Sequence, residues 1–234
     1  MSIKIRIKFA KYGAMKFIGH LDMMRFFQKA IRRAGIDIRY SEGFSPHQIM
    51  SFAAPLGVGI ESSGEYMDIE VLSMTSTEDM KQALNQVMVE GVEVLSVSVL
   101  PDNAKNAMAS VAAASYRLKM KEGSFPIADL IGQLQNFYGQ KQIPYTKETK
   151  KSVVELDLKK GLYEIEADAD GAIRMLVNAS SSGNIKPTMV FEKFCEYVKI
   201  EIPMSAYQVT RLETYTNLAK EGEEHKFVPL ASVG

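Results

Sequence analysis

Residues 3–9, IKIRIKF, alternate apolar and basic side chains with the period of a half-buried β-strand. A helix is predicted over 20–34, where apolar residues recur at helical spacing (Leu21, Met24, Phe27 and Ile31), and Gly35 ends it. Working outward, strands are predicted over 36–40, 65–72 and 92–100, with a second helix over 77–90. The order is β-α-β-β-α-β, the ferredoxin-like arrangement of an antiparallel sheet backed by two helices.

The second half of the chain repeats this order with additional strands. A strand over 115–121 and a helix over 126–138, with Pro126 in its first turn, precede four short strands, a helix over 187–198 and a last strand over 207–215. The four short strands are predicted over 143–149, 152–158, 162–168 and 172–179. We therefore predict an α+β fold of two tandem ferredoxin-like domains. Their expected bounds are 1–101 and 115–216, with a linker over 102–114 and a poorly anchored tail over 217–234.

Composition is that of a globular protein with a real core. Of the 234 residues, 46% are hydrophobic and 24% are charged. The single cysteine, Cys195, excludes an intramolecular disulfide and an iron–sulfur cluster held by this chain's own thiolates. No apolar run approaches the roughly 20 residues that span a bilayer, and the N-terminus lacks the apolar region of a signal peptide. We expect a cytoplasmic bacterial protein that has no membrane partner.

Charge is distributed unevenly along the chain. Residues 1–50 carry 10 Lys and Arg against 3 Asp and Glu, whereas residues 51–110 carry 2 against 9. Four basic residues share one side of the helix over 20–34 with Asp22, and a further arginine follows on the next strand (Arg25, Lys29, Arg32 and Arg33, then Arg39). Guanidinium groups suit phosphate recognition, so these five residues are the candidate RNA-binding set. The alternative is that the basic and acidic segments adjoin and cancel.

The stretch Gly19-His20-Leu21-Asp22 contains one of only three histidines. Three readings stay open for His20: a structural or ligand-positioning role, acid–base chemistry on an RNA hydroxyl, or metal binding. Candidate partners are Asp22, His47 and Glu65, but their spacing matches no metal motif, and we expect no metal. We predict that these four residues and Arg25 lie close together, around a groove floored by the helix and covered by the loop over 43–64.

Three stretches together resemble a known bacterial family. FIGHLDMMRFFQKAIRRAGI, YSEGFSPHQIMSFAAPLGVGIES and GEYMDIEV are similar to the radical-SAM-linked proteins, which are encoded beside, or fused to the end of, a radical S-adenosylmethionine (SAM) protein. The resemblance is strong over residues 3–100 and implies that the partner carries the iron–sulfur cluster. The family's genomic surroundings point to RNA. No catalytic residue is carried over from the family.

The function expected from these features is that of a non-catalytic accessory, or substrate-recruiting protein, of a radical SAM enzyme. We expect it to engage RNA such as tRNA or rRNA, to hold no cofactor of its own and not to act as an enzyme by itself. One alternative is a metal-independent endoribonuclease using His20 and His47, because tandem ferredoxin-like units occur in repeat-processing endoribonucleases. The other is a scaffold that binds only protein.

Overall fold

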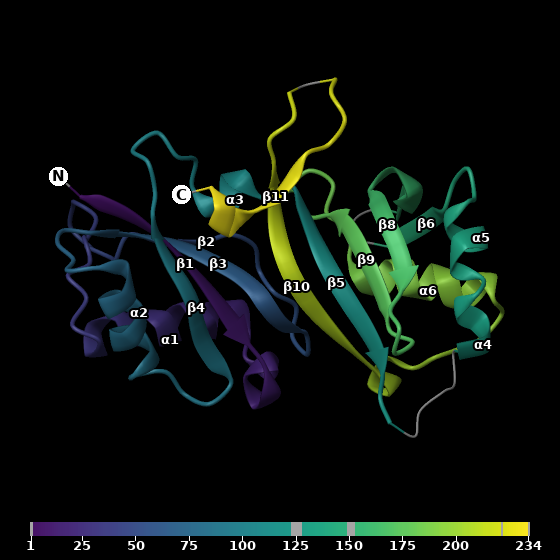
Figure 1. Cartoon of the computed structure of the whole chain (residues 1–234), viewed down its shortest axis with the longest axis horizontal. Helices are drawn as coiled ribbons and strands as arrows, with labels where there is room; N and C mark the ends of the chain where they lie inside the picture. Colours follow the sequence, from purple (N-terminus) through teal and green to yellow (C-terminus); the bar gives the residue numbers. More distant parts are fainter. Residues whose placement is uncertain (1, 123–127, 149–152, 221, 234) are drawn as a thin grey trace. The chain divides into compact units, whose positions relative to one another are not determined.

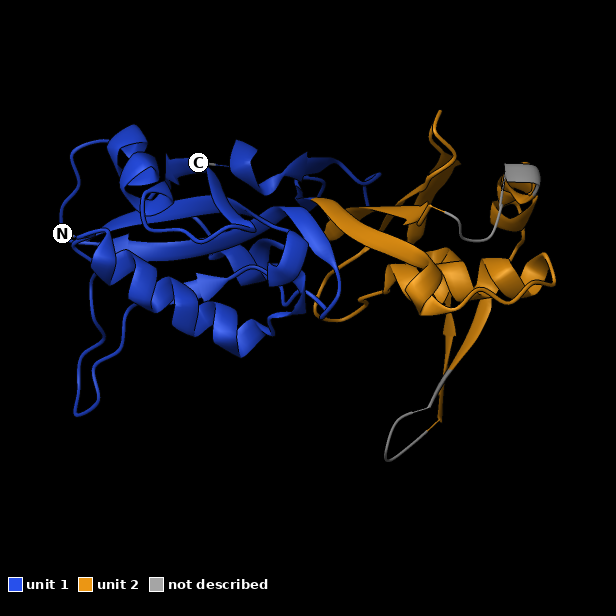
Figure 2. Ribbon diagram, turned by 90° about the horizontal axis from the view of Figure 1, so that it is seen from below, with its two compact units in different colours: residues 1–111, 213–234 blue, residues 112–212 orange. Residues whose placement is uncertain are grey.

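The computed structural model describes residues 2–122, 128–148, 153–220 and 222–233. The chain divides into two compact units, residues 1–111 with 213–234, and residues 112–212 (Figure 2). The first boundary lies inside the segment 102–114 that we expected as a linker. The second boundary falls within the last long strand, between Leu212 and Glu213. The first unit is therefore built from two separate parts of the chain.

Unit 1 contains the two principal helices of the N-terminal half (Figure 1). In chain order its main elements are β1 (Ile3–Lys11), α1 (His20–Arg33), β2 (Met50–Phe52), β3 (Glu61–Val71), α2 (Thr77–Asn85) and β4 (Val92–Val99). The short helix α3 (Ala107–Ser110) and strand β11 (Phe227–Pro229) complete it. The strands pair antiparallel in the order β4-β1-β3, and β2 pairs with β3.

Apolar and basic side chains alternate along β1, so the sheet of unit 1 has a core face and a polar face. Ile5, Ile7 and Phe9 are buried among the apolar side chains of both helices, which include Phe27 of α1 and Leu84 of α2. The intervening basic residues of β1 project from the opposite face of the sheet, as the period of a strand requires. The N-cap of α2 is Ser76, whose hydroxyl accepts from the Asp79 amide at 3.0 Å.

Unit 2 carries a second antiparallel arrangement. Its elements are β5 (Ala113–Met120), α4 (Ala128–Ile131), α5 (Leu134–Tyr138), β6 (Pro144–Glu148), β7 (Val153–Asp157), β8 (Leu162–Ala167), β9 (Ile173–Asn178), α6 (Pro187–Tyr197) and the part of β10 (Tyr207–Asn217) that ends at Leu212. The strand order is β10-β5-β9-β8, with β6 and β7 forming a separate hairpin. Phe137 of α5 and Phe194 of α6 meet edge to face at 5.6 Å in its core. Pro126, expected in the first turn of a helix, lies outside the described residues.

The fold is thus a mixed α+β structure with mostly antiparallel pairing, but three local predictions differ from the structure. The strand expected over 36–40 makes only two isolated bridges, Ile38 with Val71 and Tyr40 with Gln48. The short strand β2 instead lies inside the segment 43–64 expected as a loop. On α1, Leu21 is 67% exposed and Met23 is buried in its place, because the apolar stripe is rotated by part of a turn.

The tail expected over 217–234 also differs from the structure. β10 continues to Asn217, and β11 folds back to pair with its last three residues. Leu230 is fully buried, and its carbonyl accepts a hydrogen bond from the Arg6 guanidinium at 3.1 Å. A buried leucine and a buried polar anchor hold this segment against unit 1. Local composition does not show that this segment is anchored, because Arg6 lies more than 200 residues before Leu230 in the chain.

Candidate functional site

A small pocket in unit 1 brings together three titratable side chains from three elements. Lys11 ends β1, His20 begins α1 and Glu65 lies on β3, where its neighbour across the pair is Phe9. The remaining lining is mostly apolar (Phe9, Met23, Phe52, Ala54 and Leu56). We call this the His20 pocket. Of the residues predicted to cluster, it contains His20 and Glu65.

Packing at the His20 pocket is tight. The N-cap of α1 is Gly19, which makes no side-chain cap, so His20 is the first helical residue. The His20 ring meets Phe52 edge to face at 5.3 Å. The volume of about 10 Å³ is roughly what one water molecule needs. The pocket as it stands has no room for a substrate.

Lys11 is the member of this pocket that the sequence prediction missed. Its side chain is 3% exposed, and its Nζ donates to the Ile18 carbonyl at 2.6 Å. Burial lowers the pKa of Lys11, and the nearby Glu65 carboxylate partly opposes that shift. A signal was present in the sequence, since Lys11 follows Ile3, Ile5, Ile7 and Phe9 on the core-facing phase of β1. A charged residue at a core-facing position of a strand requires a buried partner.

The other predicted site residues lie outside the His20 pocket. Asp22 and Arg25 form an exposed ion pair at 3.1 Å on the outer side of α1. His47 is exposed, and its Nδ1 shares a hydrogen bond of 2.8 Å with the Ser41 hydroxyl. The structure therefore does not bring His47 to the His20 pocket as a second imidazole. Among the described residues, no group of three or more His, Cys, Asp or Glu side chains could hold a metal ion.

The exposed side of α1 forms a basic surface, which we call the α1 basic face and define as Arg25, Lys29, Arg32 and Arg33. All four side chains are exposed. Arg32 donates to the Gln28 carbonyl at 3.3 Å and Arg33 to the Val87 carbonyl at 3.1 Å. Within the described part of the chain, only Arg25 of this set has a carboxylate partner. Lys29, Arg32 and Arg33 therefore have no carboxylate partner among the residues that the structure describes.

The basic residues of β1 behave differently, because carboxylates neutralise two of them. Arg6 is 2% exposed and pairs with Asp68 at 2.9 Å, and Lys8 pairs with Glu213 at 2.6 Å. Arg39, predicted to extend the RNA-binding set, pairs with Glu70 at 2.9 Å. Arg6, Lys8 and Arg39 are therefore paired with carboxylates. Lys29, Arg32 and Arg33 of α1 have no such partner among the described residues.

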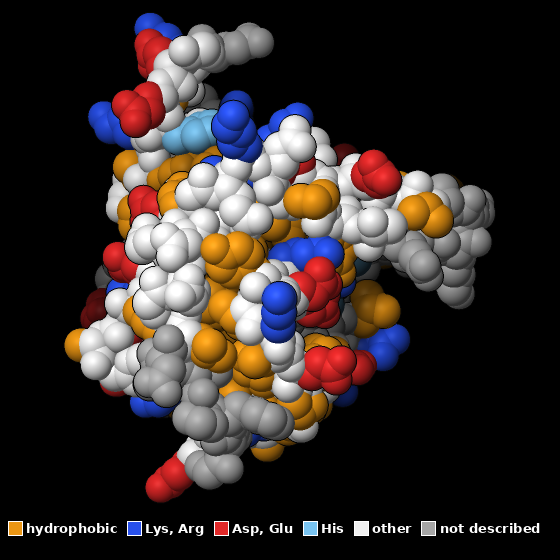
Figure 3. All heavy atoms as spheres, turned by 90° about the vertical axis from the view of Figure 1, so that its right-hand side faces the viewer, with side chains coloured by type: hydrophobic (Ala, Val, Ile, Leu, Met, Phe, Trp, Pro, Cys, Tyr) orange, Lys and Arg blue, Asp and Glu red, His pale blue; other side chains and the backbone are white. Residues whose placement is uncertain are grey.

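In unit 2, several basic side chains pair with carboxylates. Arg117 and Arg174 both pair with Asp168, and Lys119 pairs with Asp170. On the face drawn in Figure 3, basic and acidic side chains lie in small mixed groups with hydrophobic side chains between them.

Cys195 is buried, which raises the pKa of its thiol to about 11. No helix in the described ranges is long and apolar enough to cross a membrane.

Comparison with known proteins identifies a family. A family model described as "Uncharacterized protein conserved in bacteria" (DUF2344) matches residues 4–187. A comparison with curated proteins found no match.

Two solved structures show limited likeness. A chain of a Cbf5–Nop10–Gar1 complex is 10% identical, with a TM-score of 0.48 over 90% of this chain and 48% of that chain. An unknown protein from Galdieria sulphuraria is 9% identical, with a TM-score of 0.28 over 92% of this chain and 99% of that chain. The present chain spans about half the length of the first, and neither likeness is strong enough to support an argument.

Proposed function

The chain belongs to this bacterial family, and we propose that it is a non-catalytic, RNA-engaging accessory of a radical SAM enzyme. Its task would be to recruit substrate to an enzyme that supplies the iron–sulfur cluster. The motif stretches shared with the radical-SAM-linked proteins support the choice of partner. A cytoplasmic location follows from that function. The observation that carries the RNA part of the proposal is the α1 basic face.

The α1 basic face has the chemistry of a phosphate-binding surface. Arg32 and Arg33 are neighbours at the C-terminal end of α1, and Lys29 lies one turn earlier. Arginine side chains can donate paired hydrogen bonds to phosphate oxygens, and the three uncompensated charges attract a polyanion. Such contacts read the backbone rather than the base sequence. They suit a protein that holds RNA for a partner.

The His20 pocket favours a structural role over catalysis. Lys11, His20 and Glu65 come from β1, α1 and β3 and line a space of about one water molecule. General acid–base work on RNA would need an imidazole within hydrogen-bonding reach of a ribose hydroxyl. We therefore assign His20 to holding the start of α1 against Phe52.

We further infer that each unit is a variant of the ferredoxin-like arrangement. In unit 1 the strands follow the order fourth-first-third-second, written β4-β1-β3-β2. Unit 2 follows the same rule if the β6–β7 hairpin is treated as an insertion, because β10-β5-β9-β8 are then its fourth, first, third and second strands. In this scheme α1 and α2 are the two crossover helices of unit 1.

RNA binding is tested by fluorescence anisotropy with labelled bacterial tRNA and rRNA fragments. The triple variant Lys29→Gln, Arg32→Gln and Arg33→Gln should bind at least about tenfold more weakly and show a shallower salt dependence. The matched control, Lys141→Gln, Lys160→Gln and Lys199→Gln, removes three exposed lysines of unit 2 and should leave binding unchanged. Equal weakening in both triple variants would refute a specific α1 surface.

The same incubations separate the accessory from a nuclease. The RNA should remain intact at the end of each titration. Cleavage that disappears in His20→Ala would instead establish the endoribonuclease alternative.

The partner is tested by affinity purification of the full chain from its native bacterium. An iron–sulfur protein of the radical SAM class, recognised by its sequence and its iron and sulfide content, is the expected companion.

A further inference from the structure

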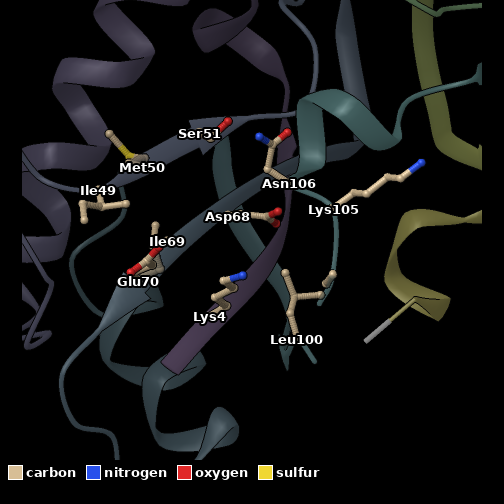
Figure 4. Close-up of a pocket in the computed structure, with 11 residues that line it drawn as sticks. Lys4, Ile49, Met50, Ser51, Asp68, Ile69, Glu70, Leu100, Lys105 and Asn106 are labelled. Atoms are coloured by element: carbon tan, nitrogen blue, oxygen red, sulfur yellow. The ribbon is translucent and has the colours of Figure 1, made fainter. Parts of the chain in front are cut away.

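A larger pocket lies on the polar face of unit 1, where Lys4 of β1 and Asp68 of β3 are among its lining residues (Figure 4). Its volume is about 370 Å³, within the range of roughly 300–1,000 Å³ typical of small-molecule sites. β1, β2, β3 and the turn that follows β4 all contribute to it. Its polar lining comprises Lys4, Ser51, Asp68, Glu70, Lys105 and Asn106. We call this the Lys4 pocket.

The acidic side chains of the Lys4 pocket are already engaged. The Asp68 carboxylate accepts hydrogen bonds from Nε and Nη2 of Arg6, at 2.9 and 3.0 Å, and from the Ala107 amide at 2.6 Å. Glu70 Oε2 accepts from Arg39 and from the Ser2 hydroxyl, both at 2.9 Å. Arg6 thus neutralises Asp68, and Arg39 neutralises Glu70. The ammonium of Lys4 is left without a carboxylate partner among the described residues.

Several donors of the Lys4 pocket remain available. Lys4 Nζ gives one hydrogen bond, to the Asp102 carbonyl at 2.7 Å, which leaves two of its three N–H groups. Asn106 caps α3 through its Oδ1, which accepts from Ala109 at 2.8 Å, so its amide N–H groups are not used in the cap. The Ser51 hydroxyl has no hydrogen bond to any described residue. Figure 4 shows the Lys4 ammonium among the lining residues, whereas Lys105 extends away from them.

Apolar surface lies beside these donors. Leu100 and Ala104 line the pocket from the segment after β4, and Ile49 lines it from the segment before β2. A ligand that satisfies both parts carries an anionic head group on a small apolar body. We propose that the Lys4 pocket binds such an organic anion, a carboxylate or a phosphate monoester, with its head group on Lys4, Asn106 and Ser51.

The test is isothermal titration calorimetry of the full chain with three probes that share a phenyl body. Benzoate and phenyl phosphate present the two anionic head groups, and benzylamine presents a cation. Binding of at least one anion, and weaker or no binding of benzylamine, is the expected result. The stronger anion then identifies the head group. No binding of either anion, or tighter binding of benzylamine, would overturn the proposal.

Two variants locate the binding. Lys4→Met removes the ammonium but keeps the stem, and it should weaken anion binding about tenfold. Asn106→Asp keeps an oxygen to cap α3, because aspartate is as good an N-cap as asparagine, but it replaces the amide donors with a negative charge. It should abolish binding. Unchanged affinity in both variants would mean that the anions bind elsewhere.

The control separates this proposal from the proposed RNA function. Lys29→Met removes an equivalent charge from the α1 basic face. It should leave the calorimetric titration unchanged while lowering RNA affinity. Lys4→Met should show the converse pattern. A loss of anion binding in Lys29→Met would count against the Lys4 pocket.

Discussion

At the scale of single residues, the Arg6–Asp68 pair is a largely buried ion pair of unit 1. Arg6 is 2% exposed and holds the Asp68 carboxylate in two hydrogen bonds, while Nη1 also donates to the Leu230 carbonyl. Removing one partner of a buried pair leaves an uncompensated charge, whereas replacing both with apolar groups is often tolerated. One arginine thus joins β1, β3 and the C-terminal segment.

Arg6→Met should lower the free energy of unfolding of unit 1 by about 3–5 kcal/mol, because the Ala107 amide is then the one donor that Asp68 keeps among the described residues. The double variant Arg6→Met with Asp68→Leu should recover part of this loss. Urea denaturation followed by circular dichroism measures both. A double variant less stable than Arg6→Met alone would show that the pair does not act as a unit.

Cys195 should be almost inert toward alkylation in the folded protein. Burial raises the pKa of its thiol to about 11, so the reactive thiolate is scarce near pH 8. An unperturbed cysteine has a pKa of about 8.5, and we expect carbamidomethylation of folded Cys195 by iodoacetamide to be at least about 100-fold slower than that of an unperturbed cysteine. The rate should rise as the pH is raised toward 11. Mass spectrometry of timed samples, with urea-unfolded protein as the reference, gives both rates.

At the scale of elements, the sequence predicted the long, strongly periodic segments and missed those decided by distant partners. Helix α1 begins at the predicted residue, and α6 begins at the predicted Pro187. The alternation of 36–40 is genuine, yet only Ile38 and Tyr40 find bridges, because strand formation depends on a neighbouring edge. The His20 pocket was half predicted. His20 and Glu65 could be inferred from their motifs. Lys11 could be found only from its position in the alternating pattern of β1, among the residues that face the core.

Strand β11 offers the sharpest test of an element that composition did not predict. Leu230 immediately follows β11 and is fully buried, so Leu230→Ala should destabilise unit 1 by about 2–5 kcal/mol. Leu218, in the connection before β11, is 53% exposed. Leu218→Ala should change stability by no more than about 0.5 kcal/mol. Urea midpoints compare the two, and equal effects would indicate that the C-terminal segment does not anchor unit 1.

At the scale of the whole molecule, the division into two units assigns the last 22 residues to the first unit. Lys8 Nζ donates to Glu213 Oε2 at 2.6 Å, and the Tyr66 hydroxyl donates to Glu213 Oε1 at 2.7 Å. The Thr214 hydroxyl donates to the Gly64 carbonyl at 2.8 Å and is almost fully buried. All of these contacts lie within unit 1. Unit 1 is therefore incomplete until the last part of the chain has been made.

This discontinuity predicts opposite behaviour for two fragments. Residues 112–212 are continuous, and they should give a dispersed amide spectrum and one cooperative thermal transition. Residues 1–111 should not fold alone, because Lys8 and Tyr66 lose the Glu213 carboxylate and Arg6 loses the Leu230 carbonyl. Co-expression of residues 213–234 with 1–111 should restore cooperative unfolding. Cooperative folding of 1–111 on its own would contradict a first unit that requires both ends of the chain.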